Sequence, residues 1–302
     1  MFASWLFGVA YGVAVVAIVL VAAVSANPVL LALVAAQAIL LVFAAYGFAY
    51  IVARTALAGP VAAIIPVVNG PNPIPDNPTE LSARAFAVGL TAALNTVGAP
   101  ALAGALVPAL GALLTPILAP WAFVVTSFAA IPNVSRNRFY QGVLGWSGWI
   151  FPMSLIASAV GFLWFAVNFP FALVSGLVGG GWPFRIDWST GAIETVGGIT
   201  GLITTVPAAA GTVGHFVFIL APFGANPAAL QQPFVVVTPP AVTNVPAHET
   251  GHTLDYTAFG GFRVLFALID QIILGNSFNA YTELTADSHV RNPGRMQVRV
   301  WS

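Results

Sequence analysis

The sequence predicts a mainly α-helical membrane protein with about four to five transmembrane helices and a small C-terminal α+β domain. Of its 302 residues, 59% are hydrophobic and only 6% are charged, whereas soluble domains carry roughly 25% charged residues. The charges are unevenly placed, because the first 181 residues carry six of them and the last 121 carry twelve. This asymmetry predicts an N-terminal part within lipid and a C-terminal part with more contact to water.

The composition also excludes some classes of protein. Nine arginines balance nine acidic residues, and there is no lysine and no basic run, so we do not expect nucleic-acid binding. The absence of cysteine excludes a disulfide framework and a thiolate metal site. The expected partner is therefore a lipid bilayer, and the expected location is integral to the membrane, with several passes.

Within residues 1–138 we expect spans near residues 5–26, 29–52, 86–107 and 109–131. These segments carry no charge, and each reaches the ~20 residues that cross a hydrocarbon core. Asn27-Pro28 predicts a tight reversal between the first two spans. The alternative interpretation of residues 1–26 is a cleaved signal peptide, since Val24-Ser25-Ala26 resembles a cleavage site.

Prolines set the next boundaries. Six prolines between residues 59 and 78 exclude a regular helix there, and Asn77-Pro78-Thr79-Glu80 then resembles a capping box that starts one. A turn is expected near Val107-Pro108. Residues 139–181 are again uncharged and form either a fifth span or a buried or interfacial segment.

Residues 182–302 predict an α+β domain. Runs at 184–189 and 192–197 flank Ser189-Thr190-Gly191, which is typical of a β-hairpin. Residues 213–220 and 234–238 are expected to be strands. His215 lies in the first of these; a structural role is the better interpretation for it, and its strand is a candidate sheet edge for pairing with a peptide.

The sequence His248-Glu249-Thr250-Gly251-His252 is an H-E-x-x-H motif. On a helix, positions i and i+4 share a face, so His248 and His252 can bind one metal ion while Glu249 acts as general base. Thr243 or Asn244 can cap this helix, and Gly260 can end it.

Catalytic zinc usually takes three protein ligands, and Glu283 is the candidate for the third. Glu283 and Asp287 are four residues apart on a predicted helix. This spacing lets Glu283 bind the metal while Asp287 accepts a hydrogen bond from a ligating imidazole.

The two motifs together resemble the gluzincin class of zinc metallopeptidases. They are most similar to the membrane-bound branch that includes the CAAX prenyl endopeptidase and the bacterial heat-shock membrane protease. The resemblance implies a zincin-like C-terminal domain, zinc (Zn2+) as cofactor, and peptides or membrane proteins as substrates. It implies His248, His252 and Glu283 as zinc ligands, Glu249 as general base and Asp287 as the partner of a ligand.

Two further residues are candidates for contact with the transition state. His289 is a possible donor to the oxyanion, an alternative ligand or a plain surface histidine. Tyr256 is also a possible donor, although burial in the core is the better interpretation.

The hypothesis is thus an integral-membrane zinc metallopeptidase. A site inside the bilayer ranks lower, because the motif helix is short and carries polar residues that would face water. The non-enzymatic alternative is a membrane scaffold with a degenerate or structural metal site.

Overall fold

The computed structural model describes residues 2–24, 78–135, 137–199, 210–231, 235–238, 241–267, 283 and 286. These residues form a mainly helical protein with three long apolar helices and a small mixed four-stranded sheet. The predicted span 29–52, the reversal at Asn27-Pro28 and the proline-rich residues before Pro78 lie outside the described residues.

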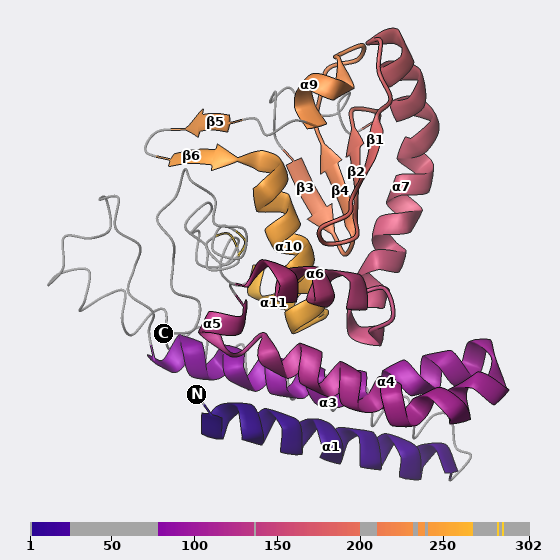
Figure 1. Cartoon of the computed structure of the whole chain (residues 1–302), viewed down its shortest axis with the longest axis vertical. Coiled ribbons are helices and arrows are strands. Elements are labelled where there is room, and N and C mark those ends of the chain that lie inside the picture. The colour runs from indigo at the N-terminus through magenta and orange to yellow at the C-terminus, as the bar shows by residue number, and fades with distance from the viewer. Residues whose placement is uncertain are drawn as a thin grey trace, which may run out of the picture.

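Three N-terminal helices lie side by side in one layer (Figure 1). They are α1 (Phe2–Val24), α3 (Pro78–Leu106) and α4 (Pro108–Phe128). As predicted, α3 begins at Pro78 and Val107 separates it from α4. Gly8 lies against the backbone of Phe86, and Gly89 lies against the backbone of Trp5, so small residues let α1 and α3 approach closely, as helices do in lipid.

Among the described residues, three helical stretches are long and apolar enough to cross a membrane: Phe2–Val21, Ala85–Leu106 and Pro152–Val178. The first two correspond to the predicted spans 5–26 and 86–107. The apolar stretch of α4, Leu113–Phe128, is shorter than these. Residues 139–181 form most of α6 (Arg138–Ser147) and then α7 (Pro152–Val178). The division of the chain into domains 1–138, 139–181 and 182–302 stays a prediction.

Helix α7 starts at the middle of α3 and runs crosswise to the helix layer (Figure 1). The Asn95 side chain accepts a hydrogen bond from the Met153 backbone N–H at 3.3 Å, which places the first turn of α7. The face that α7 turns toward the protein is small or polar and includes Ser158, Gly161 and Asn168, whereas large apolar residues such as Leu163 are exposed. This polarity is typical of a helix that packs on protein on one side and meets lipid on the other.

The four-stranded sheet packs against α7. Its strands are β1 (Phe184–Asp187), β2 (Ala192–Val196), β3 (Ala210–Val213) and β4 (Phe216–Ile219), in the order β1-β2-β4-β3. The predicted hairpin is confirmed, since β1 and β2 pair antiparallel, and β2 and β4 pair parallel.

The prediction of one continuous strand at residues 213–220 is wrong. A turn at Gly214 and His215 divides it, and Gly214 has a φ of 62°, which a residue without a side chain adopts readily. Strand β4 then lies between β2 and β3, so it is not the edge expected for peptide pairing. Strand β3 is at the edge instead.

The remaining elements include the helix α10 (Val245–Phe259), which contacts α11 and β6. The others are α5 (Pro132–Ser135), α9 (Pro227–Gln231), α11 (Phe262–Ala267) and the antiparallel pair of β5 (Val235–Thr238) and β6 (Ala241–Asn244). Leu254 and Phe259 of α10 share one core cluster with Leu90 of α3, Leu144 of α6 and Phe151. Helix α10 therefore lies between the helix layer and the sheet (Figure 1).

Burial of α10 corrects one expectation from the sequence. Its polar residues were expected to face water, yet Thr250, Asp255 and Thr257 are all buried. Thr250 and Thr257 hydroxyls donate to the Pro246 and Thr253 carbonyls one turn earlier, so part of this polarity is satisfied within the helix itself.

His215 connects the sheet to α6 and α7 from a fully buried position. Its Nε2 lies 2.8 Å from the Gly145 carbonyl and its Nδ1 lies 2.8 Å from the Ser158 hydroxyl. Because a carbonyl only accepts, Nε2 carries the proton and Nδ1 accepts from the hydroxyl. Burial lowers the pKa of His215 to about 4, although the Gly145 contact opposes this shift.

Replacing His215 should therefore change how stability depends on pH. Between pH 6.5 and 4 the unfolded chain binds a proton at His215 and the native chain does not, so the free energy of unfolding falls as the pH is lowered through this range. From pH 7 to 5 the wild type should lose about 2 kcal/mol more than His215→Gln. Denaturant unfolding at the two pH values measures this difference, and equal losses would contradict it.

Candidate metal centre

The H-E-x-x-H motif lies on α10, as predicted. The helix begins at Val245, directly after β6, with Pro246 in its first turn, and it ends before Gly260, whose φ is 58°. His248 and His252 stand one turn apart with their ring centroids 4.5 Å from each other. Both side chains are buried, with 7% and 4% of their surface exposed.

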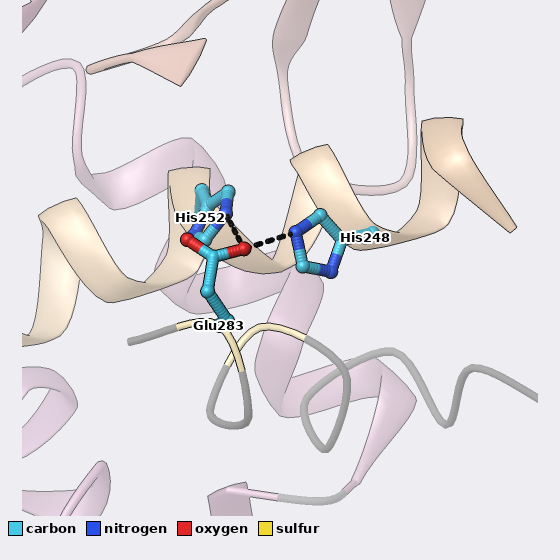
Figure 2. Close-up of side chains that lie close together, drawn as sticks. All are labelled: His248, His252 and Glu283. Carbon is cyan, nitrogen blue, oxygen red and sulfur yellow. Dashed lines mark hydrogen bonds and ion pairs between the residues drawn. The ribbon is translucent and has the colours of Figure 1, made fainter. Parts of the chain in front are cut away.

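Glu283 completes a cluster with the two histidines (Figure 2). Its Oε2 lies 2.9 Å from His248 Nε2 and 3.5 Å from His252 Nε2, and the three candidate ligand atoms all lie within 4.8 Å of one another. Ligand atoms on a tetrahedral zinc ion at bonds of 2.0–2.1 Å stand about 3.3 Å apart. Two imidazoles and one carboxylate at these separations fit a divalent metal ion.

The charge state of Glu283 also suits a metal ligand. Burial alone would raise the pKa of its carboxyl, but His252 and His248 outweigh that effect and hold this pKa well below its usual range. The carboxylate is therefore ionised at neutral pH, which is the form that binds a metal.

Glu249 faces strand β3, and its partner there was not predicted. The Thr212 hydroxyl donates to Glu249 Oε2 at 2.6 Å, and both side chains are buried. The two residues are 37 positions apart, and no local pattern in the sequence connects them. This hydrogen bond holds the Glu249 carboxylate against β3.

Other residues predicted for the site have different positions. Asp287 and His289 lie outside the described residues, so their roles stay predictions. Tyr256 is buried, and its hydroxyl accepts a hydrogen bond from Arg263 Nη1 at 3.2 Å. The Arg263 guanidinium also lies over the Tyr256 ring, 4.6 Å from its centroid.

Arg263 contacts a candidate ligand directly, which the sequence did not predict. Its Nη2 lies 2.7 Å from His252 Nδ1. A guanidinium only donates hydrogen bonds, so Nδ1 accepts here and a neutral His252 carries its proton on Nε2, the nitrogen that faces Glu283. A histidine that binds metal through Nε2 normally donates its Nδ1–H to an acceptor instead. The contact therefore opposes metal binding by His252.

An acceptor for that proton is nearby. Asp255 Oδ2 lies 3.9 Å from His252 Nδ1, on the same helix. If the guanidinium leaves Nδ1, a small rotation of the ring or the carboxylate brings these two atoms to hydrogen-bond distance, which is about 2.9 Å.

Removing the Arg263 charge should thus strengthen metal binding. We expect Arg263→Met, which keeps most of the aliphatic stem, to bind Zn2+ about tenfold more tightly than the wild type, or ~1.4 kcal/mol. Competition with a chelator measures the dissociation constant, and Arg138→Met controls for the loss of one positive charge elsewhere. Weaker binding in Arg263→Met would show that Arg263 supports the ligands.

Comparisons with known proteins identify no family for this chain. No family model, no curated protein and no solved structure matches the chain. Within the described residues, the features that bear on function are therefore the buried His248–His252–Glu283 cluster and the long apolar helices.

Proposed function

We propose that the protein is an integral-membrane, zinc-dependent metallopeptidase of the gluzincin type. The observation that carries the proposal is the position of Glu283, whose carboxylate reaches both motif histidines from 31 residues beyond His252. If the H-E-x-x-H sequence and Glu283 were unrelated, nothing would require their side chains to meet in the protein interior. The long apolar helices support the membrane location.

In this proposal the chain supplies the ligands, the base and the orientation of both. When bound, zinc would polarise the substrate carbonyl and make a water molecule more acidic. Glu249 takes the proton from the attacking water and passes it to the leaving amine. The Thr212 hydroxyl donates to Glu249 Oε2 and fixes its rotamer, so the base does not have to be ordered for each turnover.

The sheet edge beside α10 suits an extended peptide. Strand β3 is the outer strand of the four-stranded sheet, and its Thr212 contacts Glu249 on α10. An extended substrate that pairs with the outer side of β3 would place a peptide bond near Glu249 and the histidines. With long apolar helices in the same chain, membrane-associated peptides or membrane proteins are the proposed substrates.

The proposal also assigns roles to three residues outside the His248–His252–Glu283 cluster. Asp287 accepts a hydrogen bond from a ligating imidazole and so fixes its orientation. His289 and Tyr256 are the proposed donors to the developing oxyanion. Because Tyr256 already contacts Arg263, we expect it to reach the substrate only when Arg263 moves.

One observation favours the non-catalytic alternative, a membrane scaffold with a structural or degenerate metal site. Arg263 Nη2 already contacts His252 Nδ1, and this contact opposes metal binding by His252, as a degenerate site would have it.

The variant Glu249→Gln separates the two functions. It keeps the three ligands and the shape of the side chain but cannot take a proton, so we expect zinc content equal to the wild type and peptide hydrolysis lowered at least about 100-fold. Metal analysis and cleavage of a fluorogenic peptide library by the detergent-purified protein measure both.

Unchanged turnover in Glu249→Gln would contradict the mechanism. Zinc in both proteins with hydrolysis in neither would favour the scaffold. Thr212→Val, which removes only the hydroxyl contact to Glu249, serves as an intermediate case, with full zinc content and partly reduced turnover expected.

A further inference from the structure

The chain that carries Glu283 lies very close to α10 at Gly251, the residue between Thr250 and His252. A methyl group at Gly251 would lie 2.6 Å from the Cα and 2.6 Å from the carbonyl carbon of Ala286, and nearer still to the carbonyl oxygen. Ala286 is fully buried. Because all of these are backbone atoms, no side-chain rotation relieves the overlap, and the Ala286 backbone itself has to move.

The size of that movement matters for Glu283. Ordinary contact begins at 3.4 Å, so the two carbon atoms alone require the Ala286 backbone to retreat by about 0.8 Å, and the nearer carbonyl oxygen requires more. Glu283 and Ala286 both have helical backbone and are three residues apart along the chain, so we expect a shift of Ala286 to reach Glu283. Metal–ligand distances hold to within about 0.2 Å, which makes this displacement large for a ligand.

The backbone conformation at position 251 does not require a glycine. Gly251 lies inside the regular helix α10, and its φ is outside the left-handed region. Glycine is less favourable than alanine in a helix interior, so local preference acts against it. The close approach of the Ala286 backbone is the feature that requires the absence of a side chain at Gly251.

We propose that Gly251 is a positioning residue of the metal centre: it lets the Ala286 backbone lie directly against α10, and this contact holds Glu283 within reach of both histidines. The inference rests on the proposed metal site and names the residue that determines the position of its third ligand. Gly251 acts only through Glu283 and makes no contribution of its own to binding.

A double-mutant cycle on the full-length, detergent-purified protein tests this proposal. Zn2+ affinity is measured by chelator competition for the wild type, Gly251→Ala, Glu283→Ala and the double variant. We expect Gly251→Ala and Glu283→Ala each to weaken Zn2+ binding about tenfold to 100-fold. The double variant should bind as Glu283→Ala does, because an effect that acts only through Glu283 is not additive with its removal.

Two further observations distinguish positioning from general damage. The absorption spectrum of bound Co2+ in Gly251→Ala should match that of Glu283→Ala, since both lose the same ligand. Gly261→Ala is the matched control: a methyl group there meets nothing within 4 Å and Gly261 lies just beyond α10, so Zn2+ affinity should equal that of the wild type.

Each contrary result has a distinct meaning. Wild-type affinity in Gly251→Ala beside weakened binding in Glu283→Ala overturns the role of Gly251 alone. A double variant much weaker than Glu283→Ala also overturns it, because Gly251 then acts on more than this ligand. Wild-type affinity in Glu283→Ala overturns the three-ligand site and the inference together.

A second variant covers the case in which Gly251→Ala does not fold. Glu283→Asp withdraws the carboxylate by about one carbon–carbon bond, roughly 1.5 Å, and leaves the contact between Gly251 and Ala286 intact. Weakened Zn2+ binding in Glu283→Asp supports the requirement for close placement. Wild-type affinity would show that the site tolerates a displacement of this size, and it would overturn the proposal without any change at Gly251.

Discussion

Burial of the polar helix α10 is the constraint on which the arrangement of its neighbours depends. All but one of its fifteen residues are buried, and polar groups removed from water are costly unless they find partners. Glu283 contacts the two histidines, Thr212 of β3 contacts Glu249, and Asp187 at the end of β1 lies 3.3 Å from the Thr250 hydroxyl. Since each partner comes from a different element, α10 fixes the sheet edge, the hairpin and the chain at Glu283 relative to one another.

The scarcity of charge gives these contacts more weight. Helices α1, α4 and α7 contain no charged residue, whereas seven of the ten charged residues that the structure describes lie on the sheet, on α10 or beside α10. Arg185 and Glu194 pair across β1 and β2 at 2.7 Å, while Arg263 and Glu283 flank the motif histidines. Charges within lipid are expensive, so the lack of charge in these apolar helices fits contact with a bilayer.

Local signals in the sequence predict much of the fold. Pro78 starts α3, Pro108 starts α4, and the run from Asn244 to Gly260 gives the bounds of α10. Each of these signals acts over one or two helical turns. The H-E-x-x-H spacing is local in the same way. The approach of Glu283 was expected from the chemistry that zinc requires rather than from any local pattern.

Contacts between distant segments could not be predicted in this way. The pairing of Thr212 with Glu249, the position of Arg263 on His252 and the crosswise course of α7 (Figure 1) depend on how whole elements pack. The burial of α10 was missed for the same reason, since its polar residues resemble those of an exposed helix until their partners are known. Gly251 did carry a signal, because a glycine in a helix interior indicates a close neighbour.

The central claim is that His248, His252 and Glu283 together bind one metal ion. Elemental mass spectrometry of the detergent-purified wild type beside Glu283→Ala tests it most directly. We expect about one zinc per chain in the wild type and a large loss in the variant, as a three-ligand site requires. A wild type that binds no zinc after reconstitution, or a variant that retains all of it, would contradict the account.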